Sequence, residues 1–240
     1  MSQTSLLKTK RFLPFFVTQF LGAFNDNIYK NTLMLIIAFK ASEAFSMNSS
    51  TALNLAAGLF ILPFFLFSAI AGQITDKYEK SALIRKAKLA EIIIMAVAAV
   101  GLVMQWYPLL LILLFLMGSQ STFFGPAKYA ILPQHLEPEE LVGGNALVET
   151  GTFVAILAGT IGAGLIMQYD NYLIITACSV LVFSSLGYLC SKKIPLAAAN
   201  QSQLKISLNP VKTTYELIIK ARENRPVYLA TIAIFVDQPV

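Results

Sequence analysis

Apolar stretches long enough to cross a membrane recur through this 240-residue chain. A helix rises 1.5 Å per residue, so about 20 apolar residues span a hydrocarbon core of roughly 30 Å. Six stretches are complete, covering approximately residues 12–39, 52–75, 89–107, 109–132, 146–167 and 172–190, and a seventh begins near Val227. Because 56% of the residues are hydrophobic and only 13% are charged, the sequence predicts an all-α membrane protein and excludes an ordinary soluble domain.

Lysine and arginine residues follow the positive-inside rule for six crossings with both ends cytoplasmic. Lys8, Lys10 and Arg11 precede the first stretch, and the loops after the first, third and fifth stretches carry only Lys40. The bases between the second and third stretches are Lys77, Lys80, Arg85, Lys86 and Lys88, all of which we expect in a cytoplasmic loop. The net charge of +5 therefore reflects membrane topology, with anionic lipid headgroups as the expected neighbours, and needs no nucleic-acid partner to explain it.

The predicted loop between the second and third stretches has a fixed pattern of glycine, acid and bases. Gly72 stands four residues before Asp76, which is followed by Lys77 and Lys80. This pattern resembles the loop between the second and third helices of the major facilitator superfamily of transporters. In that family the glycine allows close helix approach, and the charges form a latch that opens and closes during transport. The resemblance therefore implies a gating loop made of these four residues.

The order of segments resembles the first half of a twelve-helix facilitator, in which two six-helix bundles enclose a central cavity. Residues 1–191 are expected to form the six-helix N-terminal bundle, and residues 192–225 a basic cytoplasmic linker. Residues 226–240 would start a seventh helix but are too few to complete a crossing. A truncated chain or gene fragment is the simplest explanation of this layout.

A polar cluster interrupts the first apolar stretch near its middle. It contains Gln19, Asn25, Asp26, Asn27 and Lys30. A charged side chain at the bilayer centre costs about 2.5 to 3.5 kcal/mol, so Asp26 should face the bundle interior and have a partner. Lys30 is a candidate, since it lies four residues later on the same helical face. The pair either only reduces the cost of insertion or, as we favour, serves a substrate or gating role together with Gln19.

The fourth and fifth stretches carry further charges and a stripe of small residues. Lys128 precedes the end of the fourth stretch and either binds an anion or reaches toward the lipid headgroups. Glu149 and Glu91 open the fifth and third stretches and are expected near the cytoplasmic face, where Glu149 is a candidate partner for Lys128. Small residues recur at every fourth position and predict a close helix contact: Gly151, Ala155, Gly159 and Ala163.

Three segments resemble the lysophospholipid transporter branch of the superfamily. They span residues 19–27, 125–132 and 144–159, and the first is similar to transporters fused to acyltransferase and acyl-activating domains, which this sequence lacks. The resemblance implies that Asp26 is a cavity acid, and that Lys128 and Glu149 belong to a charge network. Glu79 departs from the family pattern, which has a glycine at this position, and the C-terminal half of such a transporter is missing.

The favoured function is the movement of lysophospholipids, such as lysophosphatidylethanolamine, across the bacterial inner membrane by alternating access. One cavity acid and one base would engage the amine and the phosphate, with no covalent catalysis, cofactor or metal. A proton-coupled exporter of drugs or metabolites, with Asp26 as the protonation site, is an alternative within transport.

Two alternatives come from other classes: a membrane anchor or regulatory half-protein, and the membrane part of a phospholipid acyltransferase. Such an acyltransferase would need a histidine and an aspartate four residues apart. The sole histidine, His135, is instead followed by Glu140 in an acidic loop.

Overall fold

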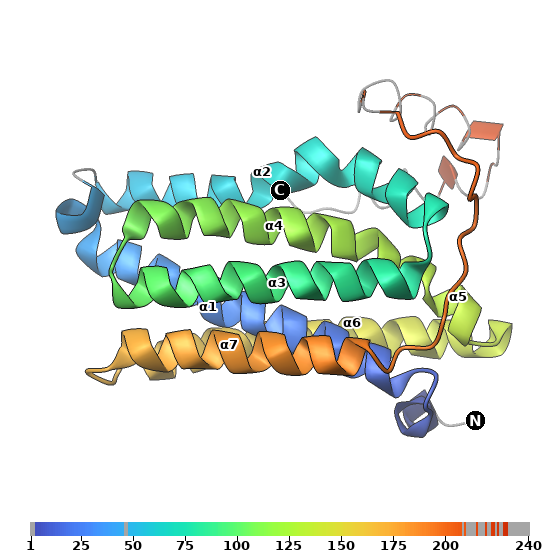
Figure 1. Ribbon diagram of the computed structural model, residues 1–240, viewed down its shortest axis with the longest axis horizontal. Helices are drawn as coiled ribbons and strands as arrows, with labels where there is room; N and C mark the ends of the chain where they lie inside the picture. The colour runs from blue at the N-terminus through green and yellow to red at the C-terminus, as the bar shows by residue number, and fades with distance from the viewer. Residues whose placement is uncertain are drawn as a thin grey trace.

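The computed structural model describes residues 3–45 and 48–207, together with positions 209, 215, 219, 222, 223, 225, 228 and 229. The described residues form helices and contain no strand (Figure 1). The six long helices are α1 (Leu13–Phe45), α2 (Ser49–Lys77), α3 (Lys80–Val103), α4 (Tyr107–Ala130), α6 (Leu141–Ile166) and α7 (Tyr172–Ser191). Short helices precede α1 and separate α4 from α6: η1 (Gln3–Lys8), α5 (Leu132–His135) and η2 (Pro138–Glu140).

Each long helix coincides with one of the predicted apolar stretches, which confirms the all-helical class. Among the described residues, four helical segments are long and apolar enough to cross a membrane: α2, α4 with α5, η2 with α6, and α7. The helices α1 and α3 are as long, but polar and charged residues interrupt their apolar stretches. The number of crossings therefore stays a prediction, and the predicted seventh helix lies outside the described residues.

The long helices run side by side along the long axis of the molecule (Figure 1). The helix α1 crosses the bundle and packs against α2, α4, α6 and α7, while α3 packs against α4 and α7. Tyr29, Leu33 and Ile37 lie one helical turn apart on α1 and are fully buried in the largest apolar cluster. The Tyr29 hydroxyl donates a hydrogen bond to the Leu110 carbonyl at 2.8 Å, which ties α1 to α4.

The small-residue stripe of α6 lies against α1, as the sequence predicts. Gly151, Ala155, Gly159 and Ala163 are all buried. A Cβ atom at Gly159 would lie 2.7 Å from the Phe24 carbonyl oxygen, too close for any residue but glycine without a backbone shift. The absence of a side chain therefore sets the distance between the two helices.

The connection between α2 and α3 is much shorter than the predicted loop. The helix α2 continues to Lys77, and α3 begins at Lys80, leaving only Tyr78 and Glu79 between them. The side chain of Glu79 accepts hydrogen bonds from the first backbone N–H groups of α3 and so starts the helix early. The prediction that residues 80–88 form a loop is wrong, because these residues form the first turns of α3.

The segment after α7 packs on the end of the bundle that also carries the chain's N-terminus (Figure 1). Ile194 and Ala197 are buried in a second apolar cluster with Phe12 and Ile84. The described part of the predicted linker, residues 192–207, is thus an ordered extended segment on the bundle. Most of residues 208–225 lie outside the described residues.

Candidate functional site

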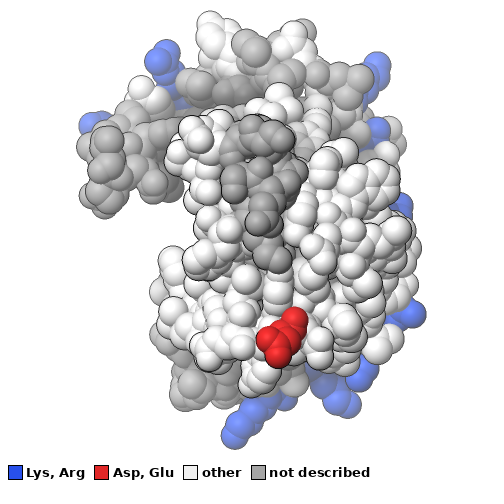
Figure 2. Space-filling view, turned by 90° about the vertical axis from the view of Figure 1, so that its left-hand side faces the viewer, with Lys and Arg blue, Asp and Glu red and all other residues white. Residues whose placement is uncertain are grey.

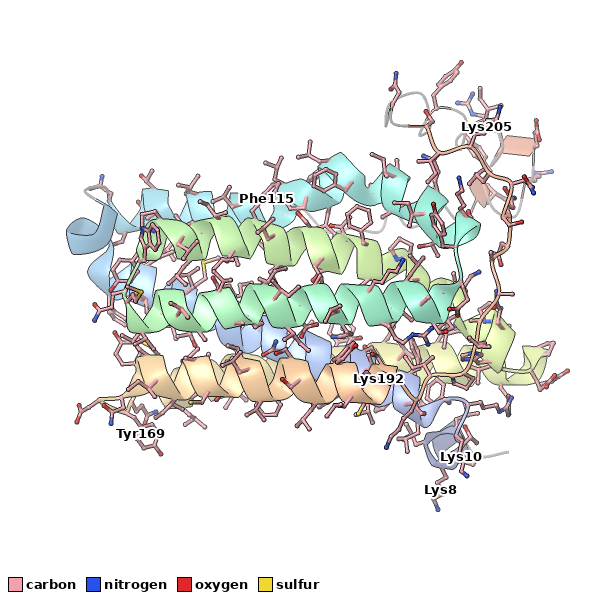
Figure 3. All side chains as sticks on the ribbon, viewed as in Figure 1. Lys8, Lys10, Phe115, Tyr169, Lys192 and Lys205 are labelled. Carbon is pink, nitrogen blue, oxygen red and sulfur yellow. The ribbon has the colours of Figure 1, made fainter. Side chains whose placement is uncertain are left out.

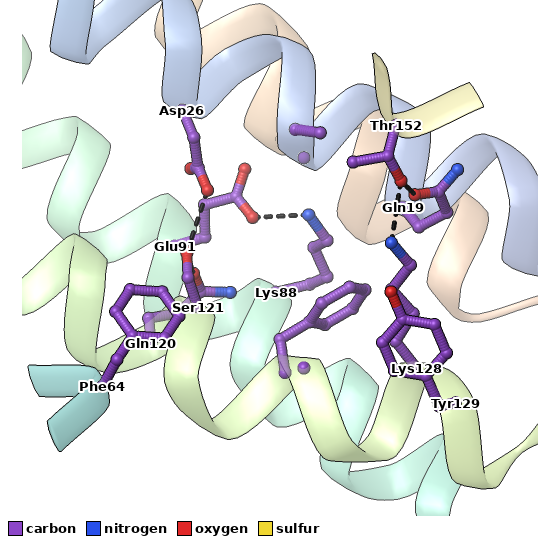
Figure 4. A pocket seen from close by; sticks show the side chains of 14 residues that line it. Gln19, Asp26, Phe64, Lys88, Glu91, Gln120, Ser121, Lys128, Tyr129 and Thr152 are labelled. Atoms are coloured by element: carbon purple, nitrogen blue, oxygen red, sulfur yellow. Dashed lines mark hydrogen bonds and ion pairs between the residues drawn. The ribbon is translucent and has the colours of Figure 1, made fainter. Parts of the chain in front are cut away.

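An open cavity of about 260 Å³ lies between the helices and is lined by both apolar and charged residues. Its walls come from α1, α2, α3, α4 and α6 (Figure 4). The ionisable lining side chains include two acids and two lysines, surrounded by amides, hydroxyls and aromatic rings. The lining residues are Gln19, Gly22, Ala23, Asp26, Phe64, Lys88, Glu91, Gln120, Ser121, Phe124, Gly125, Lys128, Tyr129 and Thr152.

Asp26 lies on α1 and is only partly satisfied by hydrogen bonds. Its Oδ2 atom accepts a hydrogen bond from the Ser121 hydroxyl on α4 at 2.9 Å. Its Oδ1 atom is buried and has no hydrogen-bond partner among the described residues. An unpaired buried carboxylate oxygen is costly, so Asp26 has the capacity to accept a hydrogen bond from a ligand cation.

Lys128 lies on α4 at the other end of the cavity. Its Nζ atom donates to the Thr152 hydroxyl at 2.7 Å, and that hydroxyl donates to Gln19 Oε1 at 2.9 Å. Lys128 Nζ also lies 3.8 Å from Glu149 Oε1, and the Tyr129 hydroxyl donates to the same oxygen. Glu149 does not line the cavity, and its side chain is 43% exposed. The structure therefore brings Lys128, Glu149 and Gln19 into one network.

Lys88 and Glu91 form a buried ion pair in the cavity wall. Lys88 was expected in a loop, but it lies inside α3 together with Glu91, and their side chains are 2% and 1% exposed. Lys88 Nζ lies 2.6 Å from Glu91 Oε2, and Asn25 Nδ2 donates to Glu91 Oε1 at 3.0 Å. Removing two charges from water is costly unless they pair closely, which this geometry achieves.

Three residues of the predicted cluster on α1 do not line the cavity. Lys30 Nζ lies 5.0 Å from the centre of the Phe60 ring, and the described residues show no ion pair between Lys30 and Asp26. Asn27 donates to the Ala23 carbonyl within α1 at 2.8 Å. Asn25 acts indirectly, through its hydrogen bond to Glu91. Of the predicted polar cluster, only Gln19 and Asp26 line the cavity.

Sequence reasoning missed the cavity residues on α3 and the hydroxyl groups on α4 and α6. Lys88 and Glu91 are three residues apart and so on one helical face, which is a signal of a buried pair once α3 is known to begin at Lys80. Ser121 and Thr152 carry no such signal, because short hydroxyl side chains are common throughout apolar helices.

The predicted gating residues meet the segment after α7. Lys80 Nζ donates to the Ala198 carbonyl at 2.8 Å and to Asn200 Oδ1 at 2.9 Å. The Lys80 backbone N–H donates to the Ala197 carbonyl at 2.9 Å. Asn200 Nδ2 in turn donates to Asp76 Oδ1 at 3.3 Å. We call this region the linker junction, formed by Asp76, Glu79 and Lys80 with residues 194–207.

Glu79 holds the linker junction together by accepting several hydrogen bonds at once. Its carboxylate accepts from the backbone N–H groups of Ser81 at 2.9 Å, Ala82 at 2.7 Å and Ala197 at 3.0 Å, and lies 3.2 Å from Arg85 Nη2. Burial acts to raise the pKa of Glu79, but the combined hydrogen bonds from the Ser81 hydroxyl and the three N–H groups lower it below its ordinary value. The residue that departs from the family pattern is therefore a structural anchor.

Gly72 and Lys77 play smaller parts in the described structure. A Cβ atom at Gly72 would meet no described atom within 4 Å, so the close helix approach expected at this glycine is not seen. Lys77 Nζ lies 5.8 Å from the centre of the neighbouring Tyr78 ring. Both residues belong to the last turns of α2.

His135 is not arranged for acyl transfer. Its Nε2 atom lies 3.5 Å from the Leu196 carbonyl, and burial lowers its pKa. Glu140, the acid that follows it in sequence, accepts a hydrogen bond from Arg11 Nη2 at 2.7 Å. The histidine and this acid therefore have separate partners, which disfavours the acyltransferase alternative.

Comparisons with known proteins extend over most of the chain. The chain is 29% identical over 175 residues to the lysophospholipid transporter LplT of Salmonella newport (strain SL254), and equally to those of Salmonella heidelberg (strain SL476) and Salmonella typhi. The aligned region covers 72% of this chain and 40% of each relative, so the match spans well under half of their length. The family model described as Major Facilitator Superfamily matches residues 15–236. The chain is a multi-pass membrane protein that belongs to the major facilitator superfamily.

Proposed function

We propose that the chain is the N-terminal six-helix half of a transporter that moves lysophospholipids across the bacterial inner membrane. The observation that carries this proposal is the cavity, which places the Asp26 carboxylate and the Lys128 ammonium between membrane-spanning helices. Ionisable residues at membrane depth are costly and are usually retained for substrate or ion binding. The similarity to lysophospholipid transporters adds independent support.

The size of the cavity suits a lipid headgroup better than a whole lipid. Sites that enclose drug-sized ligands measure about 300 to 1,000 Å³, whereas this cavity measures about 260 Å³. We propose that the headgroup enters it, with Asp26 accepting from the amine and Lys128 binding the phosphate, while Glu149 holds Lys128 in the empty state. The single acyl chain would then lie along apolar helix surface.

The proposed orientation places the start of α1 and the end of α7 on the cytoplasmic side of the membrane. Lys8, Lys10 and Lys205 lie at the end where the chain begins, whereas the α6–α7 turn at Tyr169 lies at the opposite end (Figure 3). The face at that opposite end is mostly uncharged in the described residues, with Lys and Arg visible only around its rim (Figure 2). This asymmetry supports a cytoplasmic N-terminus under the positive-inside rule.

Transport would proceed by alternating access between this bundle and a second, C-terminal half. We propose that Gly72, Asp76, Lys77 and Lys80 form the gate at the cytoplasmic end, where the short α2–α3 connection would transmit movement of one helix to the next. The linker junction would hold one state of this gate until substrate shifts the balance. A fused acyltransferase domain would use the delivered lysolipid.

Uptake of labelled lysophosphatidylethanolamine into vesicles tests the proposal. The assay compares proteins at equal membrane insertion: the chain alone, the chain joined to a second half, and joined forms that carry Asp26→Asn or Lys128→Ala. We expect uptake by the joined parent and a loss of about tenfold or more in each variant, since one charge-assisted hydrogen bond contributes about 1.5 to 3 kcal/mol. Lys30→Gln is the matched control, because Lys30 is a charged residue of α1 outside the cavity lining.

If the chain joined to a second half inserts into the membrane but takes up no lysolipid, the proposal is overturned and the proton-coupled exporter is favoured. Uptake by the chain alone would instead show that two copies assemble into a working transporter.

A further inference from the structure

The outer surface formed by α3 and α7 is apolar along most of its length. These two helices pack against each other and lie side by side on the near side of the bundle, with α1 and α6 behind them (Figure 1). Exposed apolar residues follow one helical face of each. They are Leu89, Ile93, Val97 and Val100 on α3, and Val182, Leu186 and Leu189 on α7. We call this surface the α3–α7 face, and in a membrane protein such a surface contacts lipid acyl chains.

Three exposed lysines lie where the α3–α7 face reaches the end of the bundle at which the chain begins. Lys86 comes three residues before Leu89 and therefore lies on the same face of α3. Lys192 and Lys193 directly follow the last turn of α7, and Lys193 comes four residues after Leu189. Among the described residues, none of these three lysines forms a salt bridge. The face therefore ends in positive charge that no acid neutralises.

The packing of α3 on α7 brings these lysines to nearly the same level. The helix α3 begins at the end of the bundle where α7 ends (Figure 1). A Cβ atom at Gly187 would lie 3.8 Å from the Lys88 side chain, so these two positions lie side by side. Two residues nearer that end on each helix, Lys86 lies at about the level of Leu189. Lys192 follows Leu189 by three residues, about 4.5 Å along the helix.

The surroundings of the lysines favour an anion at the membrane surface. Lys192 Nζ lies 4.6 Å from the centre of the Tyr188 ring, which holds the ammonium against the end of α7 (Figure 3). Tyrosine is common at the level of the lipid headgroups, because its ring is apolar and its hydroxyl is polar. The helix α7 contains no acidic residue, and the only acid within α3, Glu91, is buried. Neither helix therefore presents a carboxylate to this surface.

We propose that the basic end of the α3–α7 face is a binding site for an anionic phospholipid, separate from the cavity. The phosphate binds the lysines, Lys86, Lys192 and Lys193, and the acyl chains lie along the apolar face. A headgroup with net negative charge is attracted by all three ammonium groups, whereas a zwitterionic headgroup also carries an ammonium that they repel. The positive-inside rule accounts for bases at this end in general. A lipid site requires in addition that these three lysines act together. The inference does not depend on the proposed function.

Quenching of a tryptophan placed on the α3–α7 face measures lipid binding at this position. Leu189→Trp, at an exposed site between the lysines, is combined with Trp106→Phe, because Trp106 is the only tryptophan of the chain. The chain is reconstituted into mixed vesicles of phosphatidylcholine and phosphatidylglycerol, in which one lipid or the other has brominated acyl chains that quench nearby tryptophan. We expect phosphatidylglycerol to bind at least about fivefold more tightly, the effect of one lysine near the membrane surface.

Two triple variants, each of which removes three positive charges, distinguish a site from general attraction by the net charge. The first replaces the lysines of the proposed site: Lys86→Gln/Lys192→Gln/Lys193→Gln. The matched control replaces three exposed lysines on other segments at the same end of the bundle: Lys8→Gln/Lys10→Gln/Lys205→Gln. We expect the two lipids to bind within about twofold of each other in the first variant, and the preference of the parent to persist in the control. Thermal unfolding followed by circular dichroism identifies variants that fold, as expected for substitutions of exposed side chains.

Equal quenching by the two brominated lipids in the parent would overturn the inference. An equal loss of the preference in both triple variants would also overturn it, because the attraction would then follow the net charge of this end and not the three lysines of the α3–α7 face.

Discussion

The cavity and the linker junction use the same kinds of residues in opposite ways. In the cavity, Asp26 has one bonded oxygen and one buried oxygen without a described partner. In the linker junction, Glu79 accepts from three backbone N–H groups and lies beside Arg85. A buried acid with spare bonding capacity is suited to bind a ligand, whereas a saturated acid near the surface is suited to hold two segments together.

The largest effect is expected from breaking the inner ion pair of the cavity. Lys88→Met leaves Glu91 buried beside Asp26 without the cation that pairs with it, so we expect a loss of about 3 to 5 kcal/mol of stability. The double variant Lys88→Met/Glu91→Gln should recover most of that loss. The free energy of unfolding in mixed detergent micelles measures both, and a single variant as stable as the parent would contradict the burial of the pair.

A smaller effect is expected where α6 sets the position of the cavity wall on α1. Gly159→Ala places a Cβ atom 2.7 Å from the Phe24 carbonyl, so the helices must separate, at a cost of about 1 to 3 kcal/mol. Gly164→Ala is the matched control on the same helix, because a Cβ atom there meets no described atom within 4 Å. Equal melting temperatures for the two variants would show that α1 and α6 do not pack as closely as described.

At the linker junction, the expected loss of stability is that of removing one helix cap. Glu79→Ala removes the acceptor for the first turn of α3 and for the Ala197 N–H, with an expected loss of about 1 kcal/mol. Residues 194–207 should then become more accessible to protease. Glu139→Ala serves as the control, since Glu139 is an exposed acid of η2. Unchanged protease resistance in Glu79→Ala would mean that other contacts hold this segment.

The smallest effect is a pH dependence confined to the linker junction. The pKa of Glu79 is lower in the folded chain than its ordinary value of 4.5. Its stabilising contribution is therefore present above that ordinary value and is lost as pH falls through the lower folded pKa. Hydrogen exchange at the Ala197 amide reports this loss directly. Dividing the exchange rate of the parent by that of Glu79→Gln at each pH removes the intrinsic pH dependence of amide exchange. A ratio of rates that stays constant with pH would exclude Glu79 as the group that titrates.

The sequence predicted the features that depend on local composition. Long apolar stretches identified the helices, and the cost of a charge inside such a stretch singled out Asp26 and Lys128. The spacing of Gly151, Ala155, Gly159 and Ala163 predicted a helix contact, which the structure confirms.

Features that depend on packing between distant segments were not predicted. A run of bases after Asp76 is indistinguishable from a loop until Glu79 is seen to cap α3. Gly22 on another helix leaves the space that the Lys88 ammonium occupies, and Asn25 on that helix donates a hydrogen bond to Glu91. The contacts of Lys80 with Ala198 and Asn200 join residues more than 100 positions apart, which no local pattern reveals.

The most direct test asks whether a lysolipid headgroup occupies the cavity. Gly125 lines the cavity, and a Cβ atom there meets no described atom within 4 Å, so Gly125→Cys is a reporter that should not disturb the site. Gly58→Cys, on α2 outside the lining and equally unhindered, is the control, with Cys178 and Cys190 replaced by serine in both. We expect lysophosphatidylethanolamine to slow maleimide labelling at position 125 and not at position 58. Equal labelling at position 125 with and without the lysolipid would contradict it.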